Sequence, residues 1–232
     1  MRGTILVTGA SRGLGTEICG ALLLKGWQVV GMSRSSAEGV DYPQRKLDLS
    51  LAPEDFSKML GERVPLEEPI CGLVHNAAVG YDDLTTNLDA GRLEDLYRVN
   101  VINPLLLSRA VIRNFLYHRC GGNLVWIGSV AARLGFKGLA AYGGSKAALE
   151  GISRGIAREW GRKGIRSNVI SCGFMETAMT ASLDRETKER IAGRTALGRL
   201  SETAEVAGMV AYLFEPEAAG VTGAVLPVDS GA

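Results

Sequence analysis

The first fifteen residues constrain the fold more than any other part of the chain. A β-branched, apolar run from Thr4 to Thr8 predicts a buried strand. The turn that follows, from Thr8 to Gly15, holds three glycines and leads into residues with helical spacing of apolar side chains. Such a turn lets the backbone approach a pyrophosphate, and free N–H groups at the helix start favour an anion. This segment therefore predicts a dinucleotide-binding domain.

Composition limits the class of protein. The 232 residues are enough for one large α/β domain, and a net charge of +1 gives no general attraction to nucleic acid or to a membrane. No apolar run reaches the roughly 20 residues that span a bilayer. Because the chain enters a strand at once, we expect no signal peptide. The four widely spaced cysteines and two histidines predict free thiols in the cytoplasm rather than a zinc site.

The rest of the chain alternates strand and helix patterns. Further strands are predicted at residues 27–32, 45–49, 69–75, 124–127, 167–170 and 224–228. A helix and a polar loop are predicted within residues 52–68, and further helices from residue 93 through Pro104, after Tyr142, and over residues 184–192 and 202–214. Alternation of this kind predicts a parallel sheet covered by helices on both faces, without a second domain, linker or repeat.

The end of the second strand bears on cofactor choice. An acidic residue there would bind the ribose hydroxyls of NAD, but Arg34 follows the strand instead. Arg12 lies in the glycine-rich turn, and two guanidinium groups can hold a 2′-phosphate through charge-assisted hydrogen bonds. We therefore predict NADP(H) as the cofactor, with two solvated arginines as the alternative.

A second stretch carries acid–base chemistry. Tyr142 and Lys146 are four residues apart, so on a helix they lie on one face. An ammonium near a phenol favours phenolate and lowers its pKa, which suits proton exchange with a carbonyl or an alcohol. Ser129 follows a predicted buried strand and can hydrogen-bond the same oxygen. The pair alone has a plainer interpretation, an amphipathic tyrosine beside a snorkelling lysine.

Taken together, these motifs resemble the short-chain dehydrogenase/reductase family over essentially the whole chain. The glycine-rich turn, Asp48-Leu49, His75-Asn76-Ala77-Ala78, and the segment from Cys172 to Thr177 occur in the family's motif order. Four positions match its catalytic tetrad: Asn100, Ser129, Tyr142 and Lys146. The resemblance implies a single doubly wound Rossmann domain over residues 1–232. It also implies a seven-stranded, mainly parallel sheet and a substrate lid at about residues 175–200.

Within the family, the chain is most similar to β-ketoacyl-[acyl carrier protein] reductases. The stretches that carry this likeness are Trp126 to Val130, Gly173 to Thr180, Leu197 to Leu200 and Val221 to Gly223. Four positions depart from the family pattern: His75 replaces an asparagine, Ala78 a glycine, Cys172 a proline, and Ala178 a residue that is often aspartate. None of them removes a catalytic group, but they leave room for a specialised pathway.

The resemblance assigns a role to each site residue. Tyr142 would protonate the alkoxide, Ser129 would bind the carbonyl oxygen, Lys146 would hold the nicotinamide ribose, and Asn100 would hold a water. The positions that match cofactor contacts are Gly9, Ser11, Arg12, Gly13, Leu14, Gly15, Arg34, Asp48, Leu49, Asn76, Ala77, Ala78, Tyr142, Lys146, Gly173, Met175 and Thr177. No metal is expected.

The expected activity is NADPH-dependent reduction of a ketone to a secondary alcohol, with a β-ketoacyl thioester on an acyl carrier protein as the first candidate substrate. Arg113, His118, Arg119, Arg162 and Lys163 are candidate contacts for an acidic carrier, or else a solvated rim. The alternatives are a free-standing alcohol, sugar or steroid dehydrogenase and a non-catalytic NADP(H)-binding sensor. The family also implies a homotetramer or a homodimer.

Overall fold

The structure is a computed structural model, and it describes residues 2–51, 56, 69–177 and 184–232. The described residues form one seven-stranded sheet in the order β3-β2-β1-β4-β5-β6-β7, and every adjacent pair of strands is parallel. The predicted α/β, doubly wound architecture is therefore confirmed. The helix and polar loop expected within residues 52–68 and the middle of the expected lid, residues 178–183, lie outside the described residues.

The strands are β1 (Thr4–Thr8), β2 (Gln28–Ser33), β3 (Gln44–Lys46), β4 (Ile70–His75), β5 (Gly122–Ile127), β6 (Ile165–Cys172) and β7 (Val225–Val228). The α-helices are α1 (Leu14–Leu24), α3 (Ala90–Tyr97), α4 (Asn103–His118), α5 (Ala131–Leu134), α6 (Ala140–Trp160), α7 (Arg185–Ala192) and α8 (Thr203–Leu213). Shorter helical turns are η1 (Thr85–Asn87), η2 (Arg98–Ile102), η3 (Gly161–Lys163) and η4 (Pro216–Ala218).

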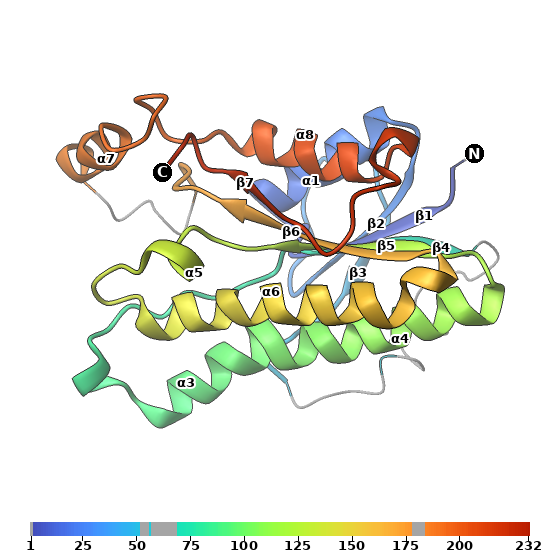
Figure 1. The fold of residues 1–232 in the computed structure, drawn as a ribbon, viewed down its shortest axis with the longest axis horizontal. Coiled ribbons are helices and arrows are strands. Elements are labelled where there is room, and N and C mark those ends of the chain that lie inside the picture. The colour runs from blue at the N-terminus through green and yellow to red at the C-terminus, as the bar shows by residue number, and fades with distance from the viewer. Residues whose placement is uncertain (1, 52–55, 57–68, 178–183) are drawn as a thin grey trace.

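Helices cover both faces of the sheet, as Figure 1 shows: α1 and α8 lie on one face, and α3, α4 and α6 lie on the other. Each layer closes over its own core. Leu6, Leu73 and Trp126 belong to the core under α4 and α6, whereas Ile5 and Val125 belong to the core under α1 and α8. Adjacent residues of β1 and of β5 face opposite layers, which is why these strands have continuous apolar runs.

Two elements differ from the sequence-based prediction. The third strand ends at Lys46, so Leu47, Asp48 and Leu49 form the loop that follows it. The predicted helix through Pro104 is interrupted by η2, a π-helical segment in which the N–H of Asn103 reaches the carbonyl of Arg98. A π-helical turn is a rare insertion that apolar spacing does not reveal, and such turns are frequent at functional sites.

All seven strands point the same way, so their carboxyl ends share one edge of the sheet. Ser129 follows β5, Asn76 follows β4 and Gly173 follows β6 at that edge. Ligands of open α/β sheets bind at this edge. The chain also ends there: Arg133 Nη2 on α5 donates to the carbonyl oxygen of Ala232, whereas the start of β1 lies at the far edge (Figure 1). Within the described part of the chain, no helix is both long and apolar enough to cross a membrane.

Candidate active site

The glycine-rich turn after β1 is fixed by side chains from β1 and β4. Asn76 Nδ2 donates to the carbonyl oxygens of Thr8 at 3.0 Å and Gly9 at 3.1 Å. The Thr8 hydroxyl in turn accepts the N–H groups of Asn76 and Ala77. Gly9 has a φ of 67°, and a Cβ there would lie 2.9 Å from the Cα of Ala77. Only glycine fits this position, which brings the predicted cofactor residues Gly9, Asn76 and Ala77 together.

The start of α1 has the features of a phosphate site. Gly13 is its N-cap residue with a φ of 55°, and no side chain caps the helix. A Cβ on Gly13 would meet nothing within 4 Å, so the space in front of the helix is open on this side. A Cβ on Gly15 would instead overlap the carbonyl of Gly9, which explains the close packing of turn and helix. Uncapped N–H groups facing open space suit the pyrophosphate of a dinucleotide.

The far end of this cleft is basic on its surface. Arg12 in the turn and Arg34 after β2 are both exposed. Asp48 has a lowered pKa, mainly because its carboxylate accepts hydrogen bonds from the hydroxyl and the N–H of Ser50, with the charge of Arg34 contributing. Arg34 is therefore near the Asp48 loop, so these two predicted cofactor contacts lie close together. Leu49 behind it is buried.

Tyr142 and Lys146 share one face of α6, as the spacing predicted. The Lys146 ammonium is buried, donates to the carbonyl of Ile127 at 2.8 Å and lies 5.8 Å from the centroid of the Tyr142 ring. Burial lowers the pKa of Lys146 to about 8. Burial also raises the pKa of Tyr142 to about 12, so the expected lowering of the phenol pKa by Lys146 is not seen. Desolvation of the phenol outweighs the ammonium, whose hydrogen bond goes to the backbone.

Ser129 and Cys172 flank the phenol. A hydrogen bond with Ser129 opposes the rise in the pKa of Tyr142, so the two hydroxyls meet as the motif predicted. The Val130 N–H donates to the carbonyl of Cys172 at 2.9 Å, which ties the segment after β5 to the end of β6. Burial raises the pKa of the Cys172 thiol to about 12, so this residue is a neutral neighbour of Tyr142 and Lys146.

Asn100 lies in η2 and is buried. Its amide group exchanges two hydrogen bonds with the backbone of Val79, at 2.9 and 3.0 Å. It also donates to the Ser145 hydroxyl at 3.1 Å, and Ser145 donates to the carbonyl of Tyr142. Pro104 has no N–H, so the Asn100 carbonyl lacks the donor that an α-helix would supply. The sequence analysis identified Asn100 but missed Ser145, although Ser145 lies between Tyr142 and Lys146.

His75, the last residue of β4, packs behind the candidate site residues. It is buried, its ring stacks on Trp126 with centroids 4.1 Å apart, and its Nε2 is 2.7 Å from the Ser108 hydroxyl. Burial, with a contribution from the charge of Lys146, lowers the pKa of His75 to about 3. The imidazole is therefore neutral at neutral pH and is fixed by its contacts with Trp126 and Ser108. The stacking on Trp126 had no signal in the sequence.

The remaining predicted residues follow β6. A Cβ on Gly173 would lie 2.7 Å from the Cα of Asp229, and Met175 pairs with Ser201 in an isolated parallel bridge. Gly173, Met175 and Thr177 are partly buried at the carboxyl edge. The described part of the expected lid includes α7, a charged helix capped by Asp184.

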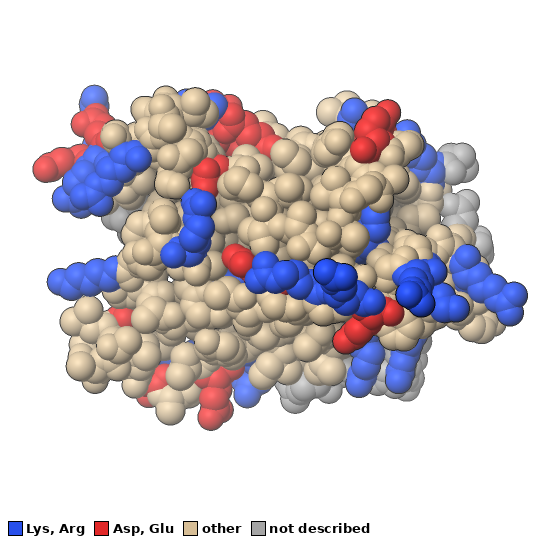
Figure 2. Space-filling view, in the orientation of Figure 1, with Lys and Arg blue, Asp and Glu red and all other residues tan. Residues whose placement is uncertain are grey.

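The candidate carrier-docking cations lie at the opposite edge of the sheet. Arg113 lies in the second half of α4 and Arg119 directly follows that helix, whereas Arg162 and Lys163 belong to η3. The N–H of Gly122 donates to the carbonyl of Gly164, so the two loops are neighbours. Figure 2 shows Lys and Arg side chains over α6 and around this end of the molecule. With a rise of 1.5 Å per residue, Arg162 and Lys163 lie about 30 Å from Tyr142 along α6, and with Arg119 they are called the distal basic cluster.

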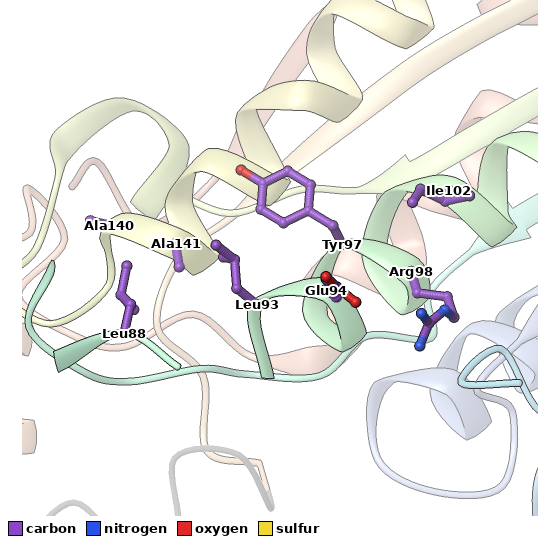
Figure 3. Close-up of a pocket in the computed structure, with 8 residues that line it drawn as sticks. All are labelled: Leu88, Leu93, Glu94, Tyr97, Arg98, Ile102, Ala140 and Ala141. Atoms are coloured by element: carbon purple, nitrogen blue, oxygen red, sulfur yellow. The ribbon is translucent and has the colours of Figure 1, made fainter. Parts of the chain in front are cut away.

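A surface hollow of about 740 Å³ lies beside the start of α6. It is bounded by Leu88, Leu93, Glu94, Tyr97, Arg98, Ile102, Ala140 and Ala141 (Figure 3). These residues come from α3, η2, the loop before α3 and the first turn of α6. None of the four tetrad side chains lines it. The hollow therefore lies on the outer side of the helix that presents Tyr142.

Comparisons with known proteins agree with this geometry. The model of a family described as "Enoyl-(Acyl carrier protein) reductase" matches residues 9–232. A 3-oxoacyl-[acyl-carrier-protein] reductase of Salmonella typhimurium is 35% identical over 233 residues, covering 97% of this chain and 95% of the relative. A solved "short chain dehydrogenase/reductase family protein" superposes with a TM-score of 0.87 at 29% identity, covering 98% and 96% of the two chains. A gluconate 5-dehydrogenase from Burkholderia cenocepacia, solved with NADP and tartrate, gives 0.90 at 25% identity, covering 98% and 94%.

Proposed function

The chain belongs to the short-chain dehydrogenase/reductase family, and from that membership we propose that it is an NADPH-dependent ketoreductase acting on β-ketoacyl thioesters. The observation that carries the proposal is the arrangement of Tyr142, Ser129 and Lys146 at the carboxyl edge, next to an uncapped helix start. The proposal places the enzyme in the cytoplasm, where its four cysteines stay thiols.

The cradle fits a dinucleotide. Gly9 and Gly15 leave no room for side chains where the turn packs on β4 and α1, whereas the space before Gly13 is open. The first turn of α1 and Ser11 would hold the pyrophosphate. Arg12 and Arg34 would hold a 2′-phosphate, and Asp48 with Leu49 would border the adenine. Bound there, NADPH supplies the hydride from its nicotinamide ring.

The residues around the nicotinamide end handle the proton. A phenol with a pKa of about 12 carries its proton at neutral pH, which suits donation to a carbonyl oxygen as charge develops there. Ser129 would donate a hydrogen bond to the same oxygen. The Lys146 ammonium would hold the nicotinamide ribose, and the Asn100 carbonyl left without a helical donor by Pro104 would hold a water that reprotonates the site.

The predicted carrier contacts lie away from the proposed site, because they belong to the region of α4 and η3. A carrier bound at the distal basic cluster would be about 30 Å from Tyr142 of the same chain, so that cluster does not serve this chain's own cleft. Lys137, exposed on the loop between α5 and α6, is a cation on the catalytic side. We therefore propose Lys137 as the nearer contact for an acidic carrier or for the phosphate of its prosthetic group.

A sugar or polyol dehydrogenase is the second candidate. The gluconate 5-dehydrogenase whose structure superposes on this chain was solved with NADP, and its fold covers nearly all of this chain. The same tetrad would oxidise a secondary alcohol in the reverse direction. NADPH oxidation at 340 nm with acetoacetyl thioesters, free and carrier-bound, and with keto sugars would separate the two candidates. An enoyl thioester completes the set, because the matched family is described as enoyl reductases.

The decisive variant is Tyr142→Phe. It keeps the ring and removes only the hydroxyl, so we expect kcat for the keto substrate to fall at least about a hundredfold with unchanged NADPH binding. Fluorescence titration with NADPH and turnover with acetoacetyl thioester measure the two quantities. Turnover within a few-fold of the native enzyme would overturn the assignment of Tyr142, and turnover by no ketone in the native enzyme would favour the sensor alternative.

A further inference from the structure

An aromatic pair joins two separate segments at the carboxyl edge of the sheet. Phe136 lies in the loop between α5 and α6, and Phe174 follows β6. Their ring centroids are 5.4 Å apart and the rings are nearly perpendicular, at 89°. Both side chains are only partly buried, so each keeps a surface available to a ligand. Edge-to-face pairs of this kind are a stable packing of phenyl rings.

The pair lies beside the catalytic residues. The chain passes from Ser129 through α5 to Phe136 and then enters α6, where Tyr142 occupies the first turn. The bond between the Val130 N–H and the Cys172 carbonyl holds the two segments together, two residues before Phe174. Cys172 also interacts with the Tyr142 phenol. The two rings therefore border the space that a substrate must enter to reach Tyr142.

Both segments are anchored by the backbone. The N–H of Leu139 donates to the carbonyl of Phe136, and the N–H of Asp83 donates to the carbonyl of Gly138. On the other side, the N–H of Ser201 donates to the carbonyl of Phe174. These bonds fix the positions of the rings relative to α6, so the pair is a built feature of the cleft rather than a chance contact of loose loops.

Two ion pairs lie in the same part of the molecule as the aromatic pair, and Lys137 next to Phe136 is exposed. Arg133 donates to Asp229 at 3.1 Å and to the carbonyl of Ala232, and Lys188 contacts Glu176 at 3.2 Å. A polyhydroxylated chain placed on two phenyl rings would lose hydrogen bonds to water without replacement. An alkyl chain in the same place loses only unfavourable contact with water.

We infer that Phe136 and Phe174 form an apolar wall that selects substrates with an unbranched alkyl chain over polyhydroxylated ketones. This inference rests on the proposed ketoreductase function and narrows its substrate class. Because each buried methylene favours binding by several-fold, kcat/KM should rise with acyl length. We expect the eight-carbon 3-oxooctanoyl thioester to exceed the four-carbon acetoacetyl thioester by at least about tenfold.

The test compares Phe136→Ala with the native enzyme on both thioesters and on a keto sugar. Removal of the ring should lower the ratio of kcat/KM between the eight- and four-carbon substrates at least about fivefold, with the NADPH dissociation constant unchanged. Phe136→Leu, which keeps apolar bulk, should retain most of the ratio. Leu134→Ala, an apolar truncation at an exposed position on α5, is the matched control and should leave the ratio unchanged.

Each outcome is distinct. An unchanged ratio in Phe136→Ala, or a native preference for the keto sugar over both thioesters, would overturn the wall while leaving a ketoreductase. Failure of the native enzyme to oxidise NADPH with any ketone would overturn the proposed function itself, and the wall with it. Should Phe136→Ala not fold, as judged by its melting transition and NADPH binding, the ratio in Phe136→Leu decides, since loss of the ratio there contradicts a role for apolar bulk.

Discussion

Burial of single charged and polar groups sets the chemistry of the site at the residue scale. Lys146 and His75 are both buried and both have lowered pKa values, yet only the pKa of Lys146, about 8, leaves it charged at neutral pH. The positive charge is therefore confined to the residue that faces the proposed ribose. His75, with a pKa of about 3, fills the space beneath without adding a second charge.

The buried ammonium should cost stability. The pKa of Lys146 falls from 10.5 in the unfolded chain to about 8, so protonated Lys146 destabilises the fold by about 3 kcal/mol below pH 8. Between these two pKa values the unfolded chain binds more protons, so stability rises with pH and the cost is gone above pH 10.5. We expect Lys146→Met to be inactive but more stable than the native enzyme at pH 7, with the difference shrinking as pH rises through this window.

Urea unfolding of both proteins at several pH values between 7 and 10.5 measures this difference. The variant leaves the Ile127 carbonyl without its donor, which offsets part of the gain at every pH alike. The change of the difference with pH is thus the informative quantity. A difference that does not vary with pH would contradict the lowered pKa.

Cofactor choice is also decided by single residues. We expect Arg34→Ala and Arg12→Ala each to raise the dissociation constant for NADPH about tenfold or more, since charged hydrogen bonds contribute about 1.5–3 kcal/mol. NADH, which lacks the 2′-phosphate, should bind the variants and the native enzyme equally. Arg154→Ala on the outer face of α6 is the control. An equal rise of the dissociation constants for NADPH and NADH would show that the arginines do not bind the 2′-phosphate.

At the scale of the element, the sequence predicted those parts that depend on periodicity and missed those that depend on a hydrogen-bond partner. The strands were predictable from continuous apolar runs in the sequence, because helices cover both faces of the sheet. The capping box at Glu202 and Glu205 marks the start of α8 close to its predicted position. The hydrogen bonds of Asn100 with Val79 and Ser145 and the stacking of His75 on Trp126 depend on groups that are distant in sequence, so no local pattern predicts them.

The first turn of α6 packs closely on α5, which gives an element-scale prediction. A Cβ on Gly143 would lie 2.6 Å from the carbonyl oxygen of Ala131, a backbone atom that cannot turn away. Gly143→Ala should therefore shift α6 and the neighbouring Tyr142, and lower kcat about tenfold or more, because small misplacements of catalytic groups are costly.

Gly151→Ala on the same helix is the matched control. A Cβ on Gly151 meets nothing within 4 Å, so this change should leave kcat unaltered and stabilise the enzyme by about 0.5–1 kcal/mol through helix propensity. Steady-state kinetics and thermal melts of both variants give the comparison. Equal kcat values for the two variants would show that the α5–α6 packing does not position Tyr142.

At the scale of the whole molecule, the helical layer of α3, α4 and α6 presents apolar groups to the outside. Ile102 is 47% and Leu105 41% exposed, and Ile102 also lines the hollow of Figure 3. The resemblance to the family predicts a homotetramer or a homodimer formed through these helices. An apolar ridge beside a hollow is a suitable surface for a second copy.

The mass of the protein in solution tests whether the surface around Ile102 and Leu105 binds a second copy. We expect the native enzyme to elute as a dimer or tetramer in size-exclusion chromatography with light scattering, and Ile102→Arg with Leu105→Arg to lower that mass. Leu24→Arg, at a residue that is 90% exposed at the end of α1 on the other face, should not change it. A native monomer would contradict the prediction, as would a mass that only the α1 variant lowers.

The contact between Arg133 and the carbonyl of Ala232 has a practical consequence for fusion proteins. Any purification tag or fluorescent protein joined after Ala232 begins at the catalytic edge of the sheet, within reach of α5 and the aromatic wall. The added residues would also lie next to the ion pair between Arg133 and Asp229. The strand β1 starts at the opposite edge, so a fusion joined ahead of Arg2 leaves the cleft clear (Figure 1).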